Sequence, residues 1–196
     1  MQAIVKLSRL SVFLRLALVA VAIAAGASGY SAHAQESKTD APKSDGPPVA
    51  VGGWRYEKAA NDVHLFHCEM AACVPGSKVS YRFYPAGTTM PFAQYRSEQE
   101  LVVKALQQRA APGTKISIVA IEGDDVDTLP RMYKSRRLTV HPDGSQEHVH
   151  SGILMGEKAS VSLISSSRDE KAASVSFGLY ALALMLVTQG APGSKQ

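Results

Sequence analysis

The sequence lacks the local motifs of the common catalytic sites. None of G-x-S-x-G, S-x-x-K, H-E-x-x-H, a P-loop or a Rossmann glycine fingerprint occurs in a suitable context. Ser165, Ser166 and Ser167 stand together, but no catalytic motif adjoins them. An enzyme assembled from distant Ser, His and Asp side chains stays an open alternative, because triads form in space. We therefore expect a non-catalytic protein with no cofactor.

Residues 1–34 have the pattern of a cleavable secretory signal. Lys6 and Arg9 give a basic start, and the apolar run 16–28 is shorter than the roughly 20 residues that span a bilayer. Small residues lead to Ala32-His33-Ala34, an A-x-A site that predicts cleavage between Ala34 and Gln35. No cysteine lies at the cleavage point, which argues against a lipoprotein; an uncleaved anchor is the alternative. We predict a periplasmic or secreted protein.

The mature chain has almost no net charge. The full chain has 21 Lys and Arg against 17 Asp and Glu, and the signal contains Lys6, Arg9 and Arg15 but no acid. Its removal leaves 18 basic and 17 acidic residues, a net charge of +1. A near-neutral chain lacks the electrostatic footprint of a nucleic-acid binder. We expect no nucleic-acid partner.

Only two cysteines occur, and both lie in the mature chain, at Cys68 and Cys73. Outside the cytoplasm, two cysteines with no other partner most often form a disulfide. Their C-x4-C spacing differs from the C-x-x-C of thioredoxin-like proteins. We predict a structural disulfide, with a free dithiol for redox work or soft-metal binding as the alternative.

Composition divides the mature chain into three parts. Residues 35–50 are rich in Lys, Ser, Asp, Pro and Gly and contain no aromatic residue, which predicts a flexible leader. Residues 51–188 have the size and apolar content of one domain. Residues 189–196 are predicted to be a flexible tail.

Apolar and alternating segments predict a sheet of about six or seven strands. Segment 116–121 is the most apolar of them and is expected to be a central strand. Asn61-Asp62 and Pro142-Asp143-Gly144 have turn chemistry, so each is expected to connect two strands. The strand segments are 54–56, 63–66, 79–84, 116–121, 137–140, 146–154 and 159–164.

Two capping boxes predict helices. Ser97 to Glu100 would begin a mid-chain helix that ends at Pro112-Gly113, and Ser167 to Glu170 would begin a long helix that ends near Thr188. The order of strands, helix, strands and helix predicts an antiparallel α+β domain.

The final helix is apolar on nearly every side. It and its tail carry no charge from Ala172 to Ser194, so the helix has to be buried somewhere. Packing against the sheet is the first expectation, and a partner or self-association interface is the second. Membrane insertion is the third, but the run is short for a span, and we expect no stable span in the mature chain. A protein or envelope partner would bind through this helix.

Histidines are the candidates for metal binding. Residues two apart on a strand emerge on the same face, and His148 and His150 have that spacing, with His141 across the predicted hairpin. A second group, His64 and His67, lies near Met70 and the two cysteines; imidazole, thiolate and thioether suit copper or zinc.

Ordinary structural roles are nevertheless preferred for these histidines. A disulfide would remove both thiolates, and His64 and His67 on one strand would face opposite sides. His148 and His150 fit an exposed polar strand face. We therefore predict no metal site and keep the four histidines as weak candidates only.

Charged side chains gather in two further segments. The acidic run 122–127 lacks the glycine and distal glutamate of an EF-hand loop, which favours a solvated loop over a calcium site. Arg131, Lys134, Arg136 and Arg137 would pair with this run or lie on an exposed edge strand.

The sequence combines a predicted signal peptide, Trp54 on an N-terminal strand, the nearby cysteine pair and an apolar final helix that contains Phe177-Gly178. In this combination the chain resembles the invasion-associated locus B proteins. Segments 68–84 and 164–171 are also similar to exported bacterial proteins of unknown function. The resemblance implies a mostly β domain linked to host association, with no established enzymatic activity and no transferable site residues.

These observations predict an exported non-catalytic binding or envelope and host-association module. A periplasmic metal-handling protein for copper or zinc is the alternative.

Overall fold

A computed structural model describes residues 46–70, 73–123 and 128–189. The chain divides into Met1–Lys43 and Ser44–Gln196, and all the described residues belong to the second unit. The predicted signal, most of the leader and residues 190–196 lie outside the described residues. The elements are β1 (Trp54–Ala59), η1 (Ala60–Asp62), β2 (Val63–Cys68), β3 (Lys78–Pro85), α1 (Phe92–Arg109), β4 (Lys115–Glu122), β5 (Arg131–Val140), β6 (Gln146–Met155), β7 (Ala159–Ser167) and α2 (Glu170–Thr188).

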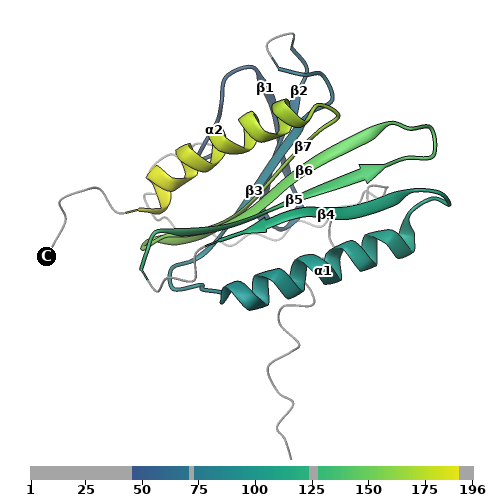
Figure 1. Ribbon diagram of the computed structural model, residues 1–196. Helices are drawn as coiled ribbons and strands as arrows, with labels where there is room; N and C mark the ends of the chain where they lie inside the picture. Colours follow the sequence, from purple (N-terminus) through teal and green to yellow (C-terminus); the bar gives the residue numbers. More distant parts are fainter. Residues whose placement is uncertain (1–45, 71–72, 124–127, 190–196) are drawn as a thin grey trace, which may run out of the picture. The chain divides into compact units, whose positions relative to one another are not determined.

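The seven strands form one antiparallel sheet in the order β1-β2-β3-β7-β6-β5-β4 (Figure 1). The β3–β7 pair, which runs from Lys78↔Ser166 to Pro85↔Ala159, joins the first three strands to the hairpins formed later in the chain. Together with one mid-chain helix and one long C-terminal helix, this sheet confirms the predicted α+β fold.

Two turns follow directly from their residues. Asn61 and Asp62 have φ of 59° and 56°, which turns β1 into β2 through a left-handed backbone. Between β5 and β6, the carboxylate of Asp143 accepts from the amide of Ser145 at 2.9 Å, and Gly144 has a φ of 81°. Both predicted connections are confirmed.

The most apolar segment is an edge strand, so its expected central position is wrong. Within the described residues β4 pairs with β5 alone, and Val119, at a β-bulge between Ile118 and Ala120, is 53% exposed. The face of β4 that carries Ile116 and Ile118 packs against α1. An apolar run indicates that a strand is covered, but it does not say by which element. Here α1 covers one face of β4, and among the described residues no strand pairs with its outer edge.

The two helices pack on opposite faces of the sheet (Figure 1). α2 lies over β7 and β6, and α1 lies against β4 and β5. Neighbouring residues of β6 show this division, because Leu154 belongs to the core under α2 and Ile153 to the core near α1. The α2 core is the larger and includes Phe66, Val79, Tyr81, Val161, Leu163, Phe177, Tyr180 and Leu184.

Neither helix begins at the predicted serine. α1 starts at Phe92, where the rings of Phe92 and Tyr95 pack at a tilt against Tyr133 with centroids 5.1 and 5.7 Å away, so Ser97 lies inside the helix. α2 is capped by Asp169, whose carboxylate accepts from the amide of Ala172 at 2.7 Å. The predicted extent of α2 to Thr188 is confirmed.

The packed region begins earlier than the predicted boundary at residue 51. Val49 is buried in the α2 core, and its amide and carbonyl both bond the hydroxyl of Tyr81, at 3.0 and 2.7 Å. The segment before β1 therefore contributes to the fold, although its composition predicted a leader.

Candidate functional site

A disulfide joins Cys68 and Cys73 and closes the connection after β2. Cys68 is buried at the end of the strand, and its backbone bonds Ser77 and Gly76 across the same turn. Because the two sulfur atoms are bonded to each other, neither is a thiolate that could bind copper or zinc.

His64 is a core side chain. Its ring stacks on Tyr81 with centroids 4.8 Å apart, and its Nδ1 lies 3.0 Å from the hydroxyl of Tyr56. Burial, with a smaller contribution from the charge of Lys58, lowers the pKa of His64. His67 lies on the opposite side of β2, with its Nε2 3.5 Å from the carboxylate of Glu57. The two imidazoles do not converge.

His150 lies beneath α2, with its ring centroid 6.0 Å from that of Phe177. Burial and the nearby Arg136 lower its pKa. His148 shares its face of β6, whereas His141 lies exposed in the turn before that strand. Across residues 46–70, 73–123 and 128–189, no three His, Cys, Asp or Glu side chains form a metal-binding group.

The serine cluster is part of the β7 core. Ser165 is fully buried, and it pairs in register with His150 on β6, but its hydroxyl has no hydrogen-bond partner. Ser167 accepts from Ser77 at 2.9 Å and from the amide of Asp169 at 3.1 Å. Ser165 and Ser167 are buried side chains of the fold, whereas Ser166 is partly exposed.

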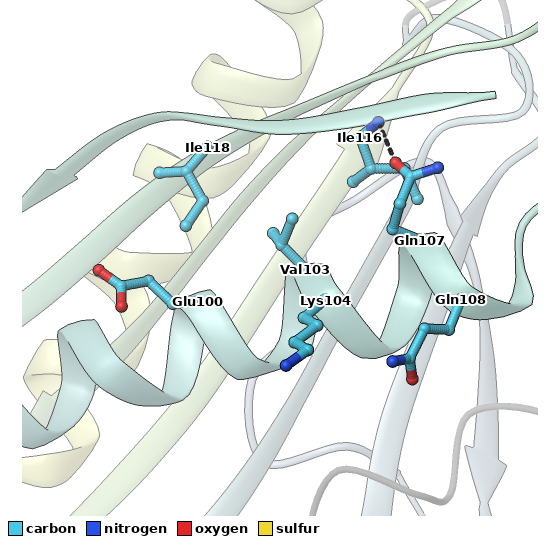
Figure 2. Close-up of a pocket in the computed structure, with 7 residues that line it drawn as sticks. All are labelled: Glu100, Val103, Lys104, Gln107, Gln108, Ile116 and Ile118. Atoms are coloured by element: carbon cyan, nitrogen blue, oxygen red, sulfur yellow. Dashed lines mark hydrogen bonds between the residues drawn. The ribbon is translucent and has the colours of Figure 1, made fainter. Parts of the chain in front are cut away.

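A shallow cleft of about 460 Å³ separates α1 from the edge strand β4 (Figure 2). Its side chains come from both elements, with Val103 facing Ile116 and Ile118 and with Glu100 and Lys104 at its rim. Gln107 bridges the two elements, because its side chain accepts from the amide of Ile116 and donates to the carbonyl of Thr114. These two bonds hold α1 against β4 at this end of the cleft.

Ion pairs occupy a second cleft, of about 510 Å³, between α2 and the face of β4 to β6. Glu122 lies 2.8 Å from Lys134, which lowers the pKa of that carboxyl, and Arg136 lies 3.5 Å from Glu170. β5, which supplies both cations, is an interior strand, so the predicted edge position of the basic segment is wrong. The predicted pairing holds for Glu122, while residues 124–127 of the acidic run lie outside the described residues.

Four apolar side chains form a line on the side of α2 that faces away from the sheet. The exposed fractions are 52% for Val175, 51% for Leu179, 61% for Leu182 and 74% for Leu186. Their spacing of four, three and four residues places them above one another along the helix. No charged residue occurs between Ala172 and Thr188. We call these four residues the outer stripe.

The opposite side of α2 packs against the sheet, which confirms the first expectation for this helix. Ala173, Phe177, Tyr180 and Leu184 are buried against the sheet. By length and composition alone α2 is also apolar enough to cross a membrane, a test that a core helix of a soluble protein can pass as well. The outer stripe is therefore apolar surface of α2 that the described residues leave uncovered.

The fold and its surfaces define a class of protein: a single antiparallel sheet with a helix on each face and an uncovered apolar helix surface. No protein-family model matches the chain, and no curated protein matches it. Among solved structures, the chain is similar to the solution structure of cyanobacterial PsbP (CyanoP) from Synechocystis sp. PCC 6803. The sequence identity is 11%, the TM-score is 0.49, and the match covers 68% of this chain and 79% of that chain.

Proposed function

We propose that this protein is an exported, non-catalytic binding module that docks a protein partner through the outer stripe of α2. The observation that carries the proposal is the exposure of Val175, Leu179, Leu182 and Leu186 on a helix without charge. Export is supported by the predicted signal and by the Cys68–Cys73 disulfide, a bond that persists in oxidising compartments.

An exposed apolar line on a helix is an unusual surface for a soluble domain. Helices that pack on a sheet normally place charged and polar side chains on their outer side. In α2 the outer side offers leucines and a valine, flanked by small residues such as Ser174 and Gly178. Contiguous apolar surface of this kind marks an interaction site. The partner that fits it is a protein with an uncharged, apolar surface about as long as the helix.

Because the chain resembles the invasion-associated locus B proteins, we propose that this partner belongs to the cell envelope or to a host. The histidines offer less support for the metal-handling alternative. His64 is bonded into the core, and the sulfur atoms of both cysteines are in the disulfide.

Site-specific photo-crosslinking tests the docking surface. The full chain is expressed with its own signal, with p-benzoylphenylalanine at position 182 in the outer stripe or, as the control, at Leu101 on α1, which is 57% exposed. We expect a protein adduct from position 182 only. The adducted protein is then purified, and its binding should be lost in Leu182→Glu and kept in Leu101→Glu.

Three results would contradict the proposal: no adduct, adducts to lipid alone, or binding that is equal in the two variants. Export is checked in the same cells by N-terminal sequencing. The expected first residue is Gln35, and an intact Met1 in the cytosol would contradict the exported location.

A further inference from the structure

The spacing of apolar residues in α2 occurs twice, on opposite sides of the helix. The inner line is Ala173, Phe177, Tyr180 and Leu184, and the outer stripe repeats the same steps of four, three and four residues, shifted by two positions. The steps average about 3.7 residues, close to the 3.6 residues of one helical turn, so each line stays on one side of the helix. The sheet covers the inner line, and the outer line gives α2 a second apolar side that the described residues leave exposed.

We propose that α2 packs antiparallel against α2 of a second copy of this chain, about a two-fold axis. This inference rests on the proposed docking role of the outer stripe, and it names a second copy of the chain as the protein bound there, in place of an envelope or host protein. With the axis midway along the stripe, Val175 lies opposite Leu186 of the second copy and Leu179 opposite its Leu182. Every side chain of the stripe then meets another, as a two-fold interface requires.

Gly178 supports a close approach of two helices. It lies in the middle of α2, where glycine costs helix stability, and a Cβ there would meet no atom within 4 Å. The fold itself therefore supplies no packing reason for a glycine at this position. In the proposed pair it borders the Leu179 and Leu182 contacts and leaves room for the side chains of the second helix.

The charges at the helix ends also suit an antiparallel pair. Lys171 is exposed in the first turn of α2, where it opposes the positive end of its own helix dipole. In the antiparallel arrangement it lies beside the last turn of the other helix, whose carbonyl groups carry partial negative charge. A membrane surface fits less well, because the stripe lacks the basic rim of interfacial helices and has cations only near its first turn.

The contact is short, so the dimer is expected to be of moderate strength. From Val175 to Leu186 the stripe covers about 16 Å of helix. Such an interface lies at the small end for specific association, so we expect a Kd on the order of micromolar and not a tighter one.

Sedimentation of the exported, processed protein tests the inference over about 1 to 200 µM. We expect a reversible monomer–dimer equilibrium that Leu182→Glu shifts to monomer and Leu101→Glu leaves unchanged. Both substituted side chains are more than half exposed, so circular dichroism should show that both variants fold. A monomer at every concentration, or a dimer that Leu182→Glu leaves intact, would overturn the inference.

Cysteine crosslinking tests the direction of the pair. The native cysteines are bonded to each other, so an introduced thiol has only its counterpart to react with. Mixing Leu179→Cys with Leu182→Cys should give a mixed dimer on mild oxidation, as should Val175→Cys with Leu186→Cys. Crosslinks of each variant with itself alone would indicate parallel helices and contradict the proposed axis.

The two proposals fail separately. If position 182 photo-crosslinks a different protein while the purified chain stays monomeric, the docking surface stands and the second copy is wrong. If position 182 gives no adduct of any kind, both are wrong.

Discussion

The imidazole of His64 links the stability of the fold to pH. Burial lowers its pKa, so between that lowered value and the unfolded value of 6.5 the unfolded chain binds more protons than the folded chain. Stability conferred by the neutral ring is complete above this window and is lost as the pH falls through it. We predict a smaller free energy of unfolding at about pH 5.5 than at about pH 7.5, measured by urea denaturation.

The difference between the two pH values should shrink in His64→Phe, which keeps the aromatic stacking but cannot titrate. His150 acts in the same direction, because burial and the neighbouring Arg136 also lower its pKa while Glu170 opposes them. His141→Gln, in the exposed turn, is the control and should preserve the difference. An unchanged pH dependence in His64→Phe would remove this residue as its source.

Gln107 protects the open edge of the sheet. Its side-chain oxygen accepts from the amide of Ile116 at 2.9 Å (Figure 2). Its side-chain nitrogen donates to the carbonyl of Thr114 at 2.7 Å, so the two bonds replace those of a neighbouring strand. We predict that Gln107→Ala lowers the free energy of unfolding by about 1 to 2 kcal/mol, the worth of two such bonds. Gln108→Ala, one position on, removes neither bond and should change it little. Equal urea midpoints in the two variants would show that water replaces both hydrogen bonds of Gln107 with no loss of stability.

At the scale of elements, local chemistry was predictable and tertiary contacts were not. The turns at Asn61-Asp62 and Pro142-Asp143-Gly144 depend on their own backbone and were predicted. The start of α1 depends on Tyr133, about forty residues later in the chain, which holds Phe92 and Tyr95 ahead of the predicted cap. The edge position of β4 depends on the pairing of distant strands, which its own composition does not encode.

The candidate site was predictable only in part. The absence of charge after Ala172 indicated that α2 has to be covered, by the sheet or by a partner. Which side of the helix meets the sheet could not be predicted, because the inner and outer lines have the same spacing. The difference lies in size: the inner line has Ala173, Phe177 and Tyr180, whose shapes fit the sheet, whereas the outer line has branched aliphatic residues only.

Two glycines around α2 should respond to alanine in opposite directions. A Cβ on Gly156 would lie 2.6 Å from the carbonyl oxygen of Thr188, so Gly156→Ala should push the end of α2 off the sheet and cost about 1 to 3 kcal/mol. A Cβ on Gly178 would meet nothing, so Gly178→Ala should stabilise the monomer by about 0.5 to 1 kcal/mol. Thermal melts at concentrations below dimerisation measure both. Destabilisation by Gly178→Ala under those conditions would contradict the open space at that position.

At the scale of the whole domain, one sheet separates two cores of unequal size. The larger, under α2, contains most of the buried aromatic rings, and the smaller, near α1, centres on Tyr95, Tyr133 and Met155. The same strands contribute alternate side chains to each core. Loss of packing in one core therefore disturbs the strands that also carry the side chains of the other core. A domain built in this way should unfold as one cooperative unit.

Trp54 provides a probe for this cooperativity, because it is the single tryptophan and packs edge-on against Tyr180 of α2, 6.1 Å between ring centroids. Ile153→Ala changes only the core on the other face and should lower the free energy of unfolding by about 2 to 5 kcal/mol. If the domain is one unit, urea denaturation followed by Trp54 fluorescence and by far-ultraviolet circular dichroism should shift to the same lower midpoint. Leu154→Ala, the neighbouring residue on the α2 face, is the matched variant and should also move both signals together. A Trp54 transition that stays in place in Ile153→Ala while the circular dichroism shifts would mean that the two cores unfold independently.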